Sequence, residues 1–152
     1  MNSFKQFSHQ YWMNEAIKLA KSTTTDIPIA AIIVKNNLLI SSGVNEIEEK
    51  KNAVLHAEIV AINEASKKLG DWRLNEYVLY TTLEPCAMCA GAIINSRISK
   101  VIFGAYDLIQ GACGSKINLF NDLEKNNIEI IGGILELECS GLLKEFFKKA
   151  RA

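Results

Sequence analysis

Two cysteines, three positions apart and directly after a proline, form the stretch of this chain with the clearest chemistry. Residues 84–89 read Glu-Pro-Cys-Ala-Met-Cys, so that Cys86 and Cys89 follow Pro85. Proline suits the first turn of a helix, because the N–H that it lacks would have no intrahelical partner there. Positions i and i+3 share one helix face. We therefore predict a helix start that carries both sulfurs on one side, where the helix dipole and a metal would favour thiolate.

The sequence His56-Ala57-Glu58 is the best candidate for the other half of a metal site. Three protein ligands with an open fourth position are the catalytic arrangement of zinc, whereas four protein ligands are the structural one. If His56 joins the two cysteines, the open position would hold a water whose pKa falls from ~15.7 to about 7. Glu58 could then carry a proton from that water to a substrate nitrogen. This requires His56 at a helix start, since residues two apart in mid-helix diverge by about 200°.

Other uses of these residue types remain open at this point. A C-x-x-C pair alone also fits a redox pair or half of a structural zinc site. Cys113 and Cys139 could complete a closed four-ligand site, but we expect ordinary reduced thiols, which pack as small hydrophobes. His9, the only other histidine, is expected at the surface or at a helix cap. Glu84 could be a second acid or base, but a supporting role is favoured because Glu58 already transfers protons.

Bulk composition indicates one globular domain over residues 1–152, with 49% hydrophobic residues. The chain has no apolar run long enough to cross a membrane, and residues 1–6 do not resemble a signal peptide. Four cysteines in this pattern are not typical of a secreted disulfide framework. We therefore expect a cytoplasmic protein. The formal net charge of +0 gives no general support for a nucleic-acid partner, although a neutral total can conceal a local basic patch.

The apolar periodicity predicts alternating helices and strands. Helices are expected at 7–21, 56–69 (ended by Gly70), 86–96, 117–123 and 135–149, and strands at 29–34, 38–44, 77–82, 100–103 and 128–131. Asn36-Asn37 should turn a hairpin between the first two strands, and 45–54 and 105–115 should be loops. This order predicts an α/β domain with helices on both faces of a largely parallel five-stranded sheet and one antiparallel hairpin.

The pattern His56-Ala57-Glu58 followed by Pro85-Cys86-Ala87-Met88-Cys89 resembles the zinc-dependent cytidine deaminase superfamily. Within that superfamily the chain is similar to the bacterial tRNA-specific adenosine deaminases. The stretches that carry this similarity are 26–31, 43–45, 82–93, 96–98, 103–107, 111–115 and 142–147. The resemblance covers nearly the whole chain and implies a three-layer α/β/α cytidine deaminase-like fold with a mixed sheet.

The resemblance implies an enzyme that hydrolyses the wobble adenosine of a tRNA anticodon to inosine. It implies one Zn²⁺ per subunit, held by His56, Cys86 and Cys89, and hydroxide that attacks C6 of a flipped-out adenine. Glu58 would shuttle protons to N1 and to the leaving ammonia. The implied partners are the tRNA anticodon stem-loop and a second copy of the chain in a homodimer.

The resemblance also implies substrate contacts, at Asn45 with the target nucleoside, at Asp107 with nucleotides at the pocket mouth, and in the last helix with the anticodon loop. The contacts expected in that helix are Phe146, Phe147 and Lys148, followed by Lys149 and Arg151. Their positions in the sequence also permit purely structural roles. Asn45 and Asp107 could be turn residues, the phenylalanines could belong to the core, and the basic residues could form a solvated helix end.

The chain departs from the family at Ala30, where glycine is frequent, and at Tyr106, where a polar residue is frequent. Tyr106 could act by stacking on an unstacked base. Two other functions remain open, a deaminase of a free base or nucleoside such as guanine or cytosine, and a non-catalytic zinc-stabilised binding module. A small-molecule enzyme should close its pocket with the C-terminal segment or a neighbouring subunit, whereas a tRNA enzyme must leave it open.

Overall fold

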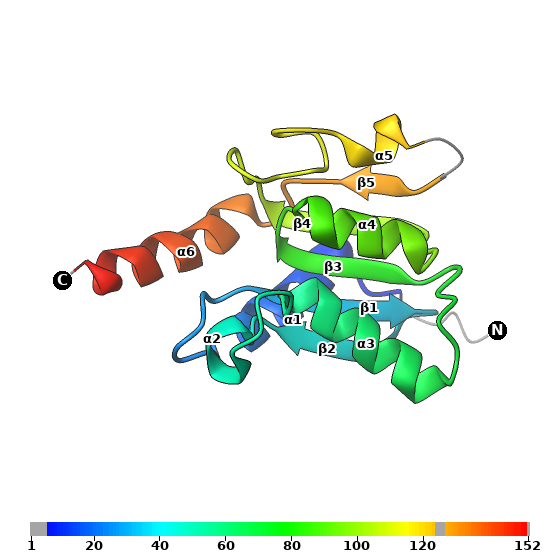
Figure 1. Ribbon diagram of the computed structural model, residues 1–152, viewed down its shortest axis with the longest axis horizontal. Helices are drawn as coiled ribbons and strands as arrows, with labels where there is room; N and C mark the ends of the chain where they lie inside the picture. The colour runs from blue at the N-terminus through cyan, green and yellow to red at the C-terminus, as the bar shows by residue number, and fades with distance from the viewer. Residues whose placement is uncertain (1–5, 124–126, 152) are drawn as a thin grey trace.

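A computed structural model describes residues 6–123 and 127–151 as a five-stranded sheet with helices on both faces (Figure 1). The strands are β1 Ala30–Lys35, β2 Leu38–Val44, β3 Val78–Leu83, β4 Lys100–Ala105 and β5 Glu129–Ile131. The helices are α1 His9–Ala20, α2 Ile47–Lys50, α3 Ala57–Leu69, α4 Ala87–Asn95, α5 Leu119–Asp122 and α6 Glu136–Ala150. The predicted three-layer arrangement is confirmed. Residues 1–5, where no signal peptide was expected, lie outside the described residues.

The sheet is less parallel than the sequence indicated. Its strand order is β2-β1-β3-β4-β5, with β1 antiparallel to both β2 and β3, and with β3–β4 and β4–β5 parallel. The mixed sheet and its antiparallel hairpin are therefore confirmed, whereas the prediction of a largely parallel sheet was wrong. The chain leaves β2 through α3 and returns on the far side of β1, so β3 runs with β2 and against the strand between them.

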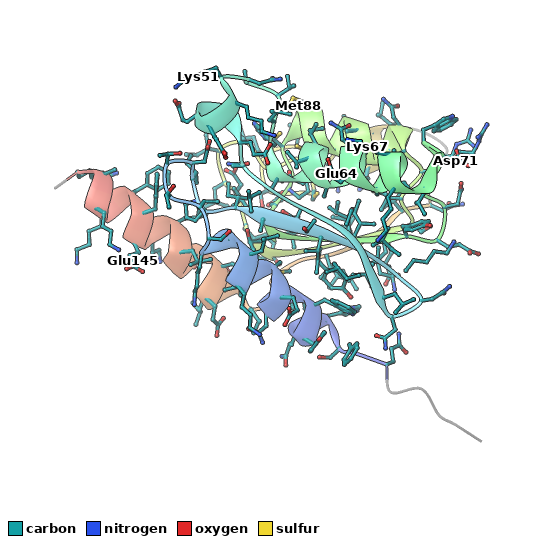
Figure 2. All side chains as sticks on the ribbon, turned by 90° about the horizontal axis from the view of Figure 1, so that it is seen from below. Lys51, Glu64, Lys67, Asp71, Met88 and Glu145 are labelled. Carbon is teal, nitrogen blue, oxygen red and sulfur yellow. The ribbon has the colours of Figure 1, made fainter. Side chains whose placement is uncertain are left out.

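Two hydrophobic cores hold the helices to the sheet. Figure 2 shows α3 and α4 on one side of the sheet and α1 and α6 on the other. Strand β1 supplies Ala31 and Ile33 to the first core and Ile32 and Val34 to the second. This alternation follows from the period of two in a strand, and a strand buried on both faces needs the continuous apolar run that the sequence shows.

The predicted turn and helix stop have the backbone angles that their residues favour. Asn36 and Asn37 have φ of 51° and 62°, as a two-residue hairpin turn requires, and Lys35 pairs with Leu38 across it. Gly70 ends α3 at φ 66°, a left-handed conformation that glycine adopts at little cost.

The helix α2 stands where an irregular loop was predicted. Asp26, which is 5% exposed, accepts hydrogen bonds from the backbone N–H groups of Glu48 at 2.8 Å and Glu49 at 3.1 Å. These are N–H groups at a helix start, which have no intrahelical acceptor. The cap comes from a residue far away in the sequence, so no local pattern around 45–54 revealed it.

The carboxyl ends of three strands meet at one edge of the sheet. Strands β2, β3 and β4 run in the same direction and lead to Asn45, to Cys86 and to Tyr106 respectively. Ligands of open α/β sheets bind at this edge. The fold therefore brings together the segments in which the sequence shows chemistry.

Candidate active site

His56 and Cys86 occupy the same position in two helices. Each is the N-cap of its helix, His56 of α3 at φ −67° and ψ 154° and Cys86 of α4 at φ −76° and ψ 176°. The extended backbone of an N-cap lies outside the helical turns. Both side chains lie beside Cys89, in the first turn of α4, and one nitrogen and two sulfurs lie within 4.8 Å of one another.

This donor set fits zinc. The Sγ of Cys86 lies 3.6 Å from the Nδ1 of His56. A tetrahedral ion with a Zn–S distance of about 2.3 Å and a Zn–N distance of about 2.0 Å would separate its sulfur and nitrogen ligands by about 3.5 Å, close to the observed distance. Thiolate and imidazole are also the ligand types that zinc prefers. In the described part of the chain this is the one group of three such residues.

The pKa values of the two thiols are shifted in opposite directions. The hydrogen bond from the Cys89 thiol, helped by His56, lowers the pKa of Cys86 to about 4, against the effect of burial. The same hydrogen bond to Cys86, together with burial, raises the pKa of Cys89. His56 has a raised pKa, chiefly because of its hydrogen bond to Cys86. A cation beside both sulfurs would stabilise the charge on this group.

Glu58 is the second residue of α3 and is only 4% exposed. Burial raises the pKa of its carboxyl, and a hydrogen bond with Cys89 opposes that shift. A raised pKa favours the protonated form of a carboxyl, and a general acid–base residue must both hold and release a proton. Because His56 stands outside the helix and Glu58 inside it, both face the same pocket.

That pocket has a volume of about 530 Å³ and opens at the carboxyl edge of the sheet. It brings together eight of the residues singled out from the sequence: Asn45, His56, Glu58, Glu84, Cys86, Tyr106, Asp107 and Phe147. Its other walls come from residues that sequence reasoning missed as site residues: Ile27, Ile29, Ile47, Leu83, Leu108, Ile109, Gln110 and Leu143. Leu108 and Ile109 could have been found from the sequence, because an apolar pair within a loop indicates a binding surface. They are 75% and 80% exposed.

Asn45 and Asp107 both line the pocket and both organise the backbone. Asn45, which is 6% exposed, accepts a hydrogen bond from the N–H of Ala57 at 3.0 Å and so steadies the start of α3. Asp107 Oδ1 accepts from the N–H groups of Ile109 and Gln110, each at 3.0 Å. Asp107 therefore forms a turn, as its position in the sequence permitted, and this turn lies at the pocket mouth.

The last helix places its two phenylalanines differently. Phe147 is 43% exposed and lines the pocket, whereas Phe146 is half-buried and packs edge-on against it at 5.4 Å between ring centroids. Lys148 lies beside a neighbouring groove of about 380 Å³, together with Leu143, Lys144, Phe147 and Arg151.

The remaining polar candidates lie outside the ligand group. Cys139, on the buried face of α6, is 1% exposed, and burial raises the pKa of its thiol to about 12, as expected for an inert thiol. Cys113 is half-buried, and burial raises its pKa as well. His9 lies in α1 with its Nδ1 at 2.8 Å from the hydroxyl of Tyr80. Tyr106 is 46% exposed at the pocket, and Ala30 is buried in β1.

Comparison with known proteins agrees with this site. Residues 6–105 match the family model described as the cytidine and deoxycytidylate deaminase zinc-binding region. The chain is 43% identical over 145 residues to a tRNA-specific adenosine deaminase of Bacillus subtilis, with 93% of this chain and 90% of the relative covered.

Solved structures show the same similarity. One from a study of A-to-I editing by tRNA:A34 deaminases at the wobble position has a TM-score of 0.84 and 33% identity over 89% of this chain and 100% of its own. Guanine deaminase from Nitrosomonas europaea has a TM-score of 0.80 and 25% identity, over 95% of this chain and 88% of its own. The chain therefore belongs to the zinc-dependent cytidine deaminase-like enzymes, within the family of the tRNA-specific adenosine deaminases.

Proposed function

We propose that this chain converts the wobble adenosine of a tRNA anticodon to inosine by zinc-dependent hydrolysis. The observation that carries the proposal is the meeting of His56, Cys86, Cys89 and Glu58 at one pocket, in a chain 43% identical to a tRNA-specific adenosine deaminase. The balanced reaction adds water at C6 of adenine and releases ammonia.

The site residues would have two separate roles, metal binding and proton transfer. His56, Cys86 and Cys89 would hold zinc, which when bound supplies the Lewis acidity that makes water nucleophilic near neutral pH. Glu58 would accept one proton of the attacking water and deliver it to N1. It would then carry the second proton, from the new C6 hydroxyl, to the amino group, which leaves as ammonia. Glu58 lines the pocket that would hold the substrate, and burial raises the pKa of its carboxyl, which favours the protonated form that can donate.

The shape of the pocket favours an RNA substrate over a free base. Its rim is formed by exposed side chains, among them Tyr106, Leu108 and Phe147. Helix α6 contributes only one wall, and Figure 1 shows it running on beyond the sheet. A nucleotide still attached to its RNA strand could enter such a pocket. The similarity to a guanine deaminase keeps free guanine as the second candidate substrate.

The groove beside the pocket supports an RNA path. Lys144, Lys148 and Arg151 line it together with Phe147, and they recur every three or four residues along α6. Cations placed in this way could contact successive phosphates, and an exposed aromatic ring could stack on an unstacked base. Asn45 and Asp107 would contact the target nucleoside and its neighbour within the pocket.

A homodimer and a cytoplasmic location are part of this proposal. Helix α4 carries no charged residue, and its Met88 is 38% exposed on the outward side of the helical layer shown in Figure 2. An uncharged, partly apolar helix face suits a contact with a second copy. Of the helices within 6–123 and 127–151, none has the length and apolarity that a membrane span requires.

The direct test offers the zinc-loaded protein two substrates in parallel, an anticodon stem-loop with adenosine at the wobble position and free guanine. We expect inosine in the RNA and no xanthine from guanine. Xanthine without inosine would establish the second candidate instead. Activity on neither, together with four protein ligands on zinc, would indicate a non-catalytic zinc module.

A further inference from the structure

Glu84 is a buried carboxylate that the proposed chemistry does not use. It is 2% exposed and stands two residues before the candidate ligand Cys86, at the end of β3. Across the salt bridges of the described segments, none involves this carboxylate. A buried charge is costly unless other groups compensate it, so its surroundings indicate what it is for.

Among the described residues, four hydrogen bonds reach this carboxylate, and all of them come from the loop after β4. Oε1 accepts from the N–H of Asp107 at 3.2 Å and from the hydroxyl of Ser115. Oε2 accepts from the N–H groups of Cys113 at 3.0 Å and Ser115 at 3.1 Å. Both oxygens are thus fully engaged with donors from the two ends of one loop.

The loop can approach this carboxylate closely because residue 111 is a glycine. A Cβ placed on Gly111 would lie 2.3 Å from the carbonyl oxygen of Asp107 and 2.5 Å from both Cδ and Oε2 of Glu84, so only glycine allows the loop both to close on itself and to approach the carboxylate. The loop also pairs with the ligand helix, since Gly111 forms a β-bridge with Cys86 and the N–H of Ala112 donates to the carbonyl of Pro85 at 2.8 Å.

The held segment is a wall of the pocket. Residues 106–110 all line it, and most of their side chains are exposed. The position of this segment therefore depends on how its backbone is held rather than on side-chain packing. We propose that Glu84 is a positioning residue for the deamination: its carboxylate joins Asp107 to Cys113 and Ser115 across the loop. The 106–110 segment is thereby held at a fixed place relative to Cys86. The expected effect on catalysis rests on the proposed function, whereas the contacts of Glu84 with the loop do not depend on it.

Glu84→Gln tests the proposal with little change in size. Either orientation of the amide turns an N–H₂ group toward backbone N–H donors, so at least one charge-assisted hydrogen bond is lost. Gly111→Ala should displace the loop while the carboxylate stays intact. Glu129→Gln is the matched control, because Glu129 is a half-exposed carboxylate that pairs with Lys100.

We expect hydrogen–deuterium exchange of the 106–115 segment to accelerate on the order of tenfold in Glu84→Gln and Gly111→Ala. Peptides from β3 and α1 should keep their protection, and zinc content should stay unchanged. The KM for the anticodon stem-loop should rise by a similar factor, with a smaller change in kcat. Glu129→Gln should change none of these.

The proposal is overturned if exchange of the 106–115 segment does not change, or if all peptides accelerate alike. A fall in kcat at constant KM, in proportion to lost zinc, would also overturn it. If the wild-type protein does not deaminate the stem-loop but exchange responds as expected, the proposed function fails while the holding of the loop by Glu84 stands.

Discussion

At the scale of single residues, the backbone position of His56 decides the geometry of the site. His56 and Glu58 are two residues apart, and in the body of a helix they would point away from each other. The helix begins between them, at Ala57, so the histidine lies outside it and the carboxylate inside. The sequence indicates the residue types but does not by itself place this boundary, because the acceptor for the first N–H of the helix, that of Ala57, is Asn45 in another segment.

Glu58→Gln removes the proton carrier while it keeps the shape of the side chain. We expect kcat on the wobble adenosine to fall about 10²–10⁴-fold, the usual contribution of a general acid–base group. Zinc content by atomic absorption should remain that of the wild type. Activity within a few-fold of the wild type would remove Glu58 from the mechanism.

His9 makes a pH-dependent contribution to stability. Burial, and then the nearby Lys100, lower its pKa below the ordinary value of 6.5. The unfolded chain therefore binds more protons in the window just below pH 6.5, so the stability contributed by neutral His9 is lost as pH falls through that window.

His9→Gln removes this titration while it keeps a partner for the Tyr80 hydroxyl. The drop in melting temperature between pH 7.5 and pH 5.5 should be smaller in this variant than in the wild type. Equal drops in the two proteins would show that His9 does not titrate differently on folding.

At the scale of helices and strands, the sequence predicted the features that depend on the backbone preferences of the residues at that position. The hairpin at Asn36-Asn37 and the stop at Gly70 were predicted, because each depends on the φ preference of the residue itself. The helix α2 was not predicted, because Asp26 caps it from a distant loop. The holding of the 107–115 loop by Glu84 was hidden for the same reason.

The helix α3 can keep its site residues in place only if it packs closely on β2. A Cβ on Gly43 would lie 2.6 Å from the carbonyl oxygen of Ala57 and 2.7 Å from the nitrogen of Ala61. Gly43→Ala should therefore destabilise the fold by about 1–3 kcal/mol through overpacking, as measured by denaturant unfolding.

Gly141→Ala in α6 is the matched control, since no atom lies within 4 Å of its added Cβ. It should leave stability unchanged or raise it by about 0.5–1 kcal/mol, because alanine favours the helix. Equal effects of the two substitutions would contradict close packing at Gly43.

At the scale of the whole molecule, the order of the strands assembles the site. Pairing between distant strands is not encoded in any short pattern, so the antiparallel β1–β3 pair was missed although each strand was found. The bulk charge of the chain was equally uninformative about RNA. A net charge of +0 conceals a basic stripe along α6, beside the pocket.

Lys148→Ala should weaken binding of the anticodon stem-loop and reduce its salt dependence. Each lost contact with a single-stranded phosphate should lower the slope of log K against log salt by about 0.7, measured by fluorescence anisotropy. Lys67→Ala on α3 is the control, because Figure 2 shows Lys67 on the opposite side of the sheet from α6. An unchanged slope in Lys148→Ala would exclude this lysine from the RNA path.

The most direct test of the account sequences the cDNA of a tRNA with adenosine at the wobble position, after incubation with this protein in three states. These are the zinc-loaded protein, the protein stripped by a chelator, and the stripped protein reloaded with zinc. We predict that position 34 reads as G with the first and third and as A with the second, and that other adenosines do not change. A reading of A at position 34 with fully zinc-loaded protein, or of G with the stripped protein, would contradict it.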